Sequence, residues 1–190
     1  MNNRGRDLKR GDCLSPTNPA LLENPLDFIH EDHLREREIC ALIDALAASR
    51  TPDTKAAACI SAFLRDELPL HLADEEEDLF PLLIRRCERE DEINRAIARL
   101  SGDHQHAEQD TPLVLDILDA IISGSGPVPD GEKVILARYA AQARRHLILE
   151  NAIILPFARL RLTKDDLETL SRRMMQRRGF NRPKETTDAD

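Results

Sequence analysis

The sequence predicts an all-α fold: an antiparallel up-down four-helix bundle with a short extra C-terminal helix. Three observations support this prediction. Only 3% of the 190 residues are aromatic and none is Trp, so the core must be aliphatic, and Leu, Ile and Ala favour helices over sheets. A charged content of 33% fits long amphipathic helices with solvated outer faces. Apolar residues also recur at steps of three and four over four long stretches.

The first of these stretches follows a polar segment. Residues 1–24 are polar and include two glycines and two prolines, which predicts a flexible N-terminal leader. From Pro25 to about Ala48 the apolar pattern predicts the first helix, with Ile29, His33 and Ile43 on one face.

The second helix is expected to begin near Thr54, after a turn at residues 49–53, and to reach Leu82. Pro69 and Pro81 interrupt it. Each proline removes a backbone donor, so each should kink the helix or end a segment.

The third helix is expected from about Asp91 to Ile122, with a bend at Pro112. Residues 123–130 read SGSGPVPD and predict a loop. A fourth helix follows from about Gly131 to Phe157. Since the connections are short, the four helices predict one bundle over residues 25–160.

The C-terminal part of the chain predicts a short fifth helix at residues 161–178. Thr163 and Asp166 resemble a capping box near its start. The basic stretch from Arg172 to Arg182 is expected to be solvated, because like charges repel one another. Residues 179–190 are polar and predict a disordered tail.

The composition restricts the classes of function. A formal net charge of −8 argues against nucleic acid, whose phosphates require a basic surface. No apolar run approaches the length that spans a membrane, and the start MNNRGRDLKRGD lacks the apolar core of a signal peptide. The four cysteines form no CxxC pair, unlike a zinc ribbon or a disulfide framework. A cytoplasmic protein without a nucleic-acid or membrane partner is expected.

Two segments repeat a pattern that can bind metal. Residues 71–81 read HLADEEEDLFP, and residues 146–156 read HLILENAIILP. Each contains a His, a Glu four positions later, and an apolar-Pro pair after that Glu. Positions i and i+4 are neighbours on one helix face. The imidazole and the carboxylate can therefore reach the same metal ion.

A further histidine precedes each of these segments. His33 precedes His71 by 38 positions, and His104 precedes His146 by 42. The chain therefore reads as two helical hairpins that would pack about a pseudo-two-fold axis and bring four imidazoles and two carboxylates together. The candidate metal ligands are His33, His71, Glu75, His104, His146 and Glu150.

Helical phase separates these candidates from neighbouring polar residues. His106 is in step with charged residues and should face solvent, whereas His30 should lie at the rim. Glu76, Glu77 and Asp78 are expected on a solvated face. Glu76 is close enough to the site to support a ligand or to substitute for one.

Tyr139 and Cys40 each lie two turns from a candidate histidine, but both are more typical of an ordinary core and are assigned no role. A polar core that is only structural is the alternative for the six candidates. Two buried carboxylates without a Lys or Arg on the same faces would then be costly, which favours metal binding.

The ligand types indicate which metal the site prefers. Imidazole and carboxylate without thiolate suit iron, manganese or zinc rather than copper(I) or an iron–sulfur cluster. Six ligands are too many for one tetrahedral zinc ion. Two iron ions are therefore expected, ahead of manganese or zinc.

The stretches PLDFIHEDH, HLADEEEDLFP and HLILENAIILP, with the DH at 103–104, resemble a hemerythrin-like (HHE cation-binding) domain of the bacterial type. The resemblance covers about residues 25–160. It implies a four-helix bundle with a non-haem di-iron centre, usually oxo- or hydroxo-bridged. By this analogy Glu75 and Glu150 bridge the irons. The resemblance assigns one iron to each histidine pair, His33 with His71 and His104 with His146.

Two departures from the oxygen-carrying hemerythrins stand out. Those proteins have a His-x-x-x-His on the third helix, whereas Glu108 stands four positions after His104, and they have Asp where this chain has Glu150. The chain is closer to the bacterial and F-box-type branch, where sensing and iron handling are reported roles. It also resembles the core of di-iron proteins that repair iron–sulfur clusters, although Cys13 stands alone in the N-terminal segment.

The leading expectation is a di-iron protein that binds, senses or reacts with O2, NO or peroxide. One alternative is an enzyme-like role in peroxide or NO detoxification, or in iron donation for iron–sulfur cluster repair. Others are an iron storage or sensing module and a helical interaction module without metal. The sequence favours binding or sensing over a dedicated enzyme, with any signal passing through an unidentified protein partner.

Overall fold

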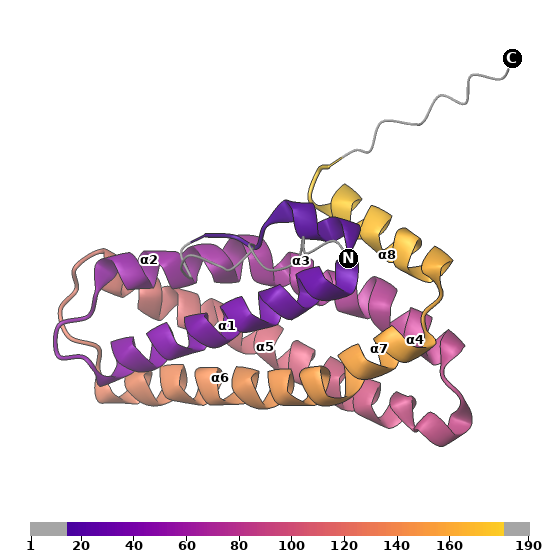
Figure 1. Cartoon of the computed structure of the whole chain (residues 1–190). Coiled ribbons are helices and arrows are strands. Elements are labelled where there is room, and N and C mark those ends of the chain that lie inside the picture. The colour runs from indigo at the N-terminus through magenta and orange to yellow at the C-terminus, as the bar shows by residue number, and fades with distance from the viewer. Residues whose placement is uncertain (1–14, 181–190) are drawn as a thin grey trace, which may run out of the picture.

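The computed structural model describes residues 15–180, and every regular element in that range is helical (Figure 1). The α-helices in chain order are α1 (Pro25–Ala48), α2 (Thr54–Ala62), α3 (Leu68–Ala73), α4 (Phe80–Arg86), α5 (Ile93–Ile122), α6 (Asp130–Leu149), α7 (Leu155–Arg161) and α8 (Lys164–Arg177). Helices α2 to α4 form the second long element of the bundle, and α6 with α7 forms the fourth. Because α1 contacts α2 and α6, and α5 contacts the same two helices, the four elements close into the predicted up-down bundle.

Three π-helical segments lie inside the second and fourth elements, at Phe63–Glu67, Asp74–Leu79 and Glu150–Ile154. A proline stands two positions after the end of each segment: Pro69, Pro81 and Pro156. A proline ring clashes with the carbonyl four residues earlier, and a wider turn relieves that clash. The expected interruptions at Pro69 and Pro81 are therefore π-turns within a continuous element. The π-helical segments at Asp74–Leu79 and Glu150–Ile154 begin beside or at a candidate glutamate.

The apolar core has two parts, one on each side of a polar layer. One part includes Ile43, Leu64 and Leu118, and the other includes Ile29 and Leu83. Buried His and Glu side chains occupy the bundle between them. The polar layer is thus shielded by apolar packing along the bundle in both directions.

Helix α8 packs on the side of the bundle, against α1 and the π-helical segment Asp74–Leu79, beside the N-terminal part of the described chain (Figure 1). The predicted capping box at its start is confirmed, since Thr163 and Asp166 each accept from the other's backbone N–H. Asp166 also accepts hydrogen bonds from Arg85 and Arg86 of α4. These contacts fasten α8 to the second element.

Basic residues of α8 cover an acidic face that sequence reasoning assigned to solvent. Arg173 pairs with Asp78, and Arg177 pairs with Asp74 and Asp78. Asp74 and Asp78 are 0% and 3% exposed, so the expectation that Asp78 is solvated is wrong. The expectation of a solvated basic stretch is wrong for Arg177 and Arg178, which are partly buried, whereas Arg172 and Arg173 are exposed as expected. Phase within one helix does not show which face another helix will cover.

Residues 15–24, part of the expected leader, pack against the bundle. A 3-10 helix at Pro19–Glu23 places Leu22 in the core at 1% exposure. Thr17 is also buried. The remainder of the expected leader, with Cys13, and positions 181–190 of the expected tail lie outside the described residues.

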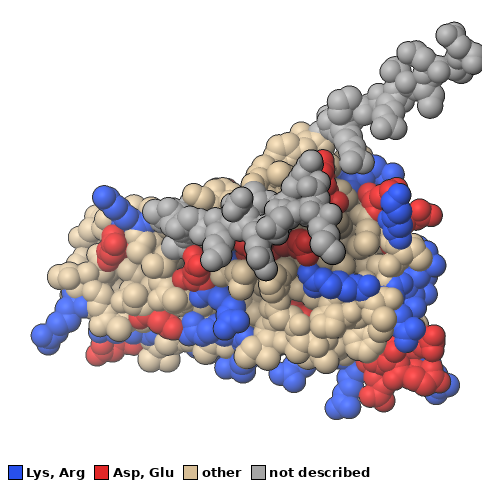
Figure 2. Space-filling model, in the orientation of Figure 1, with Lys and Arg blue, Asp and Glu red and all other residues tan. Residues whose placement is uncertain are grey.

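The surface mixes charges of both signs. On the face shown in Figure 2, Lys and Arg side chains are interspersed with Asp and Glu. Of the helices that the structure describes, none combines the length and apolarity needed to cross a membrane.

Candidate metal centre

The six predicted side chains meet inside the bundle. They come from all four long elements, because α1, α3, α5 and α6 each carry one of the four candidate histidines and two π-helical segments carry the glutamates. None is more than 7% exposed: His33, His71, Glu75, His104, His146 and Glu150. The helical phase that selected them from the sequence therefore gave the correct faces.

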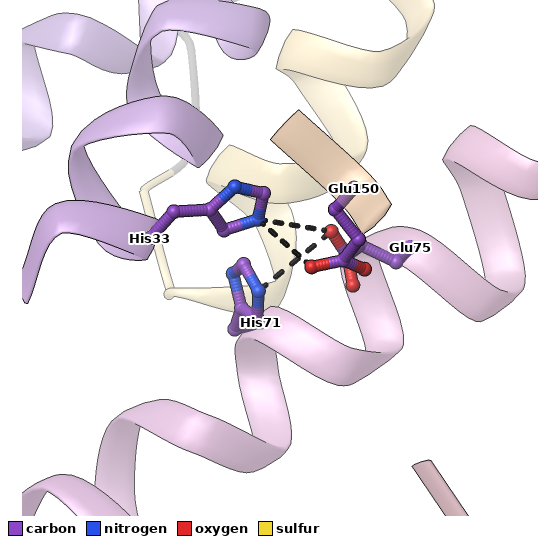
Figure 3. A group of neighbouring side chains, drawn as sticks. All are labelled: His33, His71, Glu75 and Glu150. Atoms are coloured by element: carbon purple, nitrogen blue, oxygen red, sulfur yellow. Dashed lines mark hydrogen bonds and ion pairs between the residues drawn. The ribbon is translucent and has the colours of Figure 1, made fainter. Parts of the chain in front are cut away.

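Their donor atoms form two groups that share both carboxylates. The first group consists of His33, His71, Glu75 and Glu150 (Figure 3). The second group consists of His104 and His146 with the same two glutamates. Within each group, one donor atom from every residue lies within 4.8 Å of the others. Two groups with two shared carboxylates fit a binuclear metal site.

In the first group the imidazole Nε2 atoms face the carboxylates. His33 Nε2 lies 3.4 Å from Glu75 Oε1 and 3.3 Å from Glu150 Oε2. His71 Nε2 lies 3.7 Å from the same Glu75 oxygen. Two atoms bound to one ion at about 2.1 Å stand roughly 3.0–3.4 Å apart at bond angles between square and tetrahedral. The separations are close to that range.

The second group is tighter. His146 Nε2 lies 3.0 Å from Glu150 Oε1, and His104 Nε2 lies 3.1 Å from His146 Nε2. His104 Nε2 also lies 3.4 Å from the second Glu75 oxygen. Two imidazole nitrogens that face each other at this distance need a proton or a cation between them, because their lone pairs otherwise repel.

Several buried polar atoms of the cluster have no hydrogen-bond partner among the described residues. These are Glu75 Oε2, both Glu150 oxygens, both His71 nitrogens and His146 Nδ1. A buried polar atom left unsatisfied costs about 1–3 kcal/mol. Bound cations would satisfy the oxygens and the Nε2 lone pairs together, so the residues present fit a metal site.

Each imidazole turns its Nε2 inward and its Nδ1 toward a polar side chain of another bundle element. The Nδ1 contacts are His33–Asn151 at 3.3 Å, His71–Asp32 at 3.6 Å, His104–Glu76 at 2.6 Å and His146–Asp103 at 3.9 Å. Such partners orient metal-binding imidazoles and raise their basicity.

These outer contacts close a ring around the bundle. Asp32 of the first element faces the histidine of the second, and Glu76 of the second faces that of the third. Asp103 of the third element then faces the fourth, and Asn151 of the fourth returns to His33. Each element thus supplies at least one candidate ligand and the support for another.

The contact from Asn151 also assigns the tautomer of His33. The Asn151 amide donates through Nδ2 to Leu147 O at 2.8 Å, which leaves Oδ1 to accept from His33 Nδ1–H. The Nε2 lone pair of His33 then points at the carboxylates, as a metal ligand requires.

Three of the four supporting residues escaped the sequence reasoning. A signal for them exists, because Asp precedes the histidine at both 32–33 and 103–104, and a polar residue follows the glutamate at both 75–76 and 150–151. Only Glu76 was anticipated as a residue that could support a ligand.

The residues excluded by phase lie outside the centre. His106 and His30 are exposed, as predicted, although His30 contacts Asn151 from the rim. Glu108 is exposed as well, so it does not replace the missing third-helix histidine. None of the described cysteines joins either donor group.

Charge coupling keeps the cluster ionised. Burial disfavours the charged imidazoles, but Glu75 and Asp32 raise the pKa of His71 to about 10, and the nearby Glu150 and Glu75 carboxylates raise the pKa of His104 to about 11. Burial also opposes ionisation of Glu75, yet His71 and His104 hold its pKa well below its usual value.

Metal loading is therefore expected to release protons. The pKa values of His71 and His104 are raised, so both imidazoles are protonated near neutral pH, whereas a metal ion requires neutral Nε2 donors. We expect about one to two protons per Zn(II) ion added to metal-free protein, and metal affinity that falls as the pH falls. A pH-stat titration near pH 7 measures the release, and an absence of protons would contradict the assignment of the histidines.

The ring of outer contacts predicts that replacing Glu76 weakens metal binding. Glu76→Ala removes the 2.6 Å partner of His104 and should weaken metal affinity by about 10–100-fold. Competition with a chelator of known affinity measures this change. Glu77→Ala is the matched control, because Glu77 is the adjacent glutamate and its side chain is 69% exposed. Equal affinities in the two variants would show that the contact has no supporting role.

A family model described as the Hemerythrin HHE cation binding domain matches residues 24–174. The match includes all four bundle elements and most of α8, and so extends beyond the resemblance expected over residues 25–160. No curated protein matches the chain.

Proposed function

The chain belongs to the hemerythrin HHE cation-binding family, and on that premise we propose that it is a non-haem di-iron protein that binds a small ligand, O2, NO or peroxide. The observation that carries this proposal is the pair of donor groups sharing Glu75 and Glu150. Each group offers two imidazoles and two carboxylates, which is fewer donors than a six-coordinate iron accepts. Iron bound there would supply redox chemistry and open coordination positions.

The residues around the centre support this role. Glu75 and Glu150 would hold the two ions at a fixed separation, and each histidine pair would complete the coordination of one ion. The outer ring that includes Asp32 and Glu76 fixes the imidazole orientations. The apolar packing on both sides of the layer excludes bulk water and limits side reactions.

The burial of the candidate ligands argues against a role in iron donation. An iron donor must pass its ion to an acceptor, whereas the six candidate ligands are between 0% and 7% exposed. None of the six candidate ligands is exposed at the surface, where an acceptor would have to contact it. This favours a resident centre over iron donation, and it leaves binding, sensing and consumption of a small ligand to be separated by experiment.

Anaerobic loading with Fe(II), followed by titration with O2, NO or H2O2, tests the proposal. We expect two irons per chain and a stoichiometric change in the visible spectrum with at least one of these ligands. Stable adducts would indicate binding or sensing, and rapid multiple turnover would indicate an enzyme. Fewer than one iron per chain after loading would overturn the proposal and support a structural polar core.

A further inference from the structure

A small cavity lies beside the second histidine pair. His104 and His146 form part of its wall, together with the apolar side chains of Leu72 and Ala143, whereas His33 and His71 do not line it. Its volume is about 30 Å³. A water molecule needs at least about 10–15 Å³ measured in this way, so the cavity holds a molecule of two or three non-hydrogen atoms. The two ends of the centre are therefore not equivalent.

Glu36 of α1 lines the same cavity and is an acidic side chain without a polar partner there. It is 9% exposed, and it makes no hydrogen bond or ion pair with any of the residues in the described range. Its carboxyl oxygens are not among the fully buried, unpaired atoms of the described residues, so they keep contact with water. A polar ligand in the cavity can take the place of that water. Burial raises the pKa of Glu36 in the metal-free protein. In its protonated form this carboxyl is a hydrogen-bond donor.

Of the other polar side chains in the cavity wall, Tyr139, Asp110 and Asp103 have polar neighbours, whereas Gln142 is half-buried and makes no hydrogen bond with the described residues. Thr111 Oγ1 donates to Ala107 O, so the Tyr139 hydroxyl, 2.9 Å from Thr111 Oγ1, donates to that oxygen. Asp110 accepts from Arg138. Asp103 faces His146 Nδ1 as part of the outer ring.

We propose that the small ligand binds in this cavity, at the ion held by His104 and His146, and that Glu36 donates a hydrogen bond to it. The ligand class is a di- or triatomic molecule whose far atom accepts a hydrogen bond. The inference rests on the proposed di-iron function and adds to it a specific end of the centre and a specific polar contact. The cavity lined by Asp32 and Leu70, on the His71 side, has none of the six candidate ligands in its wall.

Azide, a triatomic acceptor, is the probe. It is titrated into the oxidised, iron-loaded protein, and its dissociation constant is read from the visible spectrum. Glu36→Leu should weaken azide binding about tenfold, because one hydrogen bond is lost. Glu36→Gln keeps a donor and should stay within about threefold of the wild type. Glu38→Leu, at an exposed glutamate of the same helix, is the matched control and should change nothing.

A second variant tests the cavity without altering Glu36. Ala143→Leu adds three carbon atoms to the cavity wall and should weaken azide binding at least about 30-fold, because a cavity of this size has no room for both. Ala137→Leu makes the same change at an exposed position of α6 and should have no effect. Iron content should remain two per chain in both.

The possible outcomes separate the two proposals. Fewer than one iron per wild-type chain overturns the di-iron function itself. Two irons with azide affinity unchanged by Ala143→Leu overturn the cavity as the ligand site. Two irons, a block by Ala143→Leu and equal affinity in Glu36→Leu and the wild type overturn the role of Glu36. If Glu36→Leu does not load iron, the Glu36→Gln variant decides: a loss of affinity beyond about threefold contradicts the hydrogen bond.

Discussion

Replacing Glu75 with Gln is expected to reduce the iron content of the loaded protein from two ions per chain to one or none. Glu75 belongs to both donor groups, and its two oxygens face different histidines: Oε1 faces His33 and His71, and Oε2 faces His104. The amide keeps the volume of the side chain but loses its charge and one of its two anionic oxygens. Both ions therefore lose a shared ligand in one substitution. Metal analysis after anaerobic loading and desalting measures the change.

Glu108→Gln is the matched control for this substitution. Glu108 stands four positions after His104, where the oxygen-carrying relatives have a histidine, but it is exposed. The control should keep two irons per chain. A Glu75→Gln variant that also kept two irons with unchanged affinity would contradict the bridging role of this carboxylate, and loss of iron in Glu108→Gln would identify a ligand outside the proposed set.

Removing the metal should produce a large loss of stability. In the metal-free cluster four buried atoms that face the centre have no hydrogen-bond partner among the described residues: Glu75 Oε2, both Glu150 oxygens and His71 Nε2. The unfolded chain cannot assemble both donor groups. A metal present at about 1,000 times its dissociation constant stabilises the folded state by about 4 kcal/mol. For a chain of this size the corresponding rise in Tm is about 8–16 °C.

Thermal unfolding followed by circular dichroism, with and without loaded iron, measures this shift. The Glu75→Gln variant serves as the control, because its melting temperature should respond little to added iron. Equal melting temperatures for metal-free and loaded wild-type protein would contradict a centre that couples metal binding to folding. A shift of the same size in the variant would mean that the metal acts elsewhere on the chain.

The bundle and the six candidate ligands followed from helical periodicity, which depends only on local sequence. A three- and four-residue step identifies the buried face of a helix, and this step distinguished His104 from His106. The same local information located the prolines but not the π-turns that accommodate them. Periodicity also explains why the predicted helix ends lie within a few residues of those observed.

The features that escaped prediction depend on contacts between helices. Arg35 and Glu36 stand in a charged run that is typical of a solvated face, yet both are buried. Arg35 pairs with Glu67 at 2.5 Å and lies over the Phe63 ring, two partners that are remote in sequence. The pairs between α8 and the acidic face also join residues that are remote in sequence. The same is true of the ring of outer contacts around the histidines. Each requires knowing which helix lies next to which.

A Mössbauer spectrum of the oxidised, 57Fe-loaded protein in an applied field tests the central claim most directly. Two donor groups that share Glu75 and Glu150 predict two ferric ions close enough to couple, so that nearly all the iron should show a diamagnetic ground state. Magnetically split spectra of isolated ferric ions, accounting for the bound iron, would contradict a binuclear centre at these six residues.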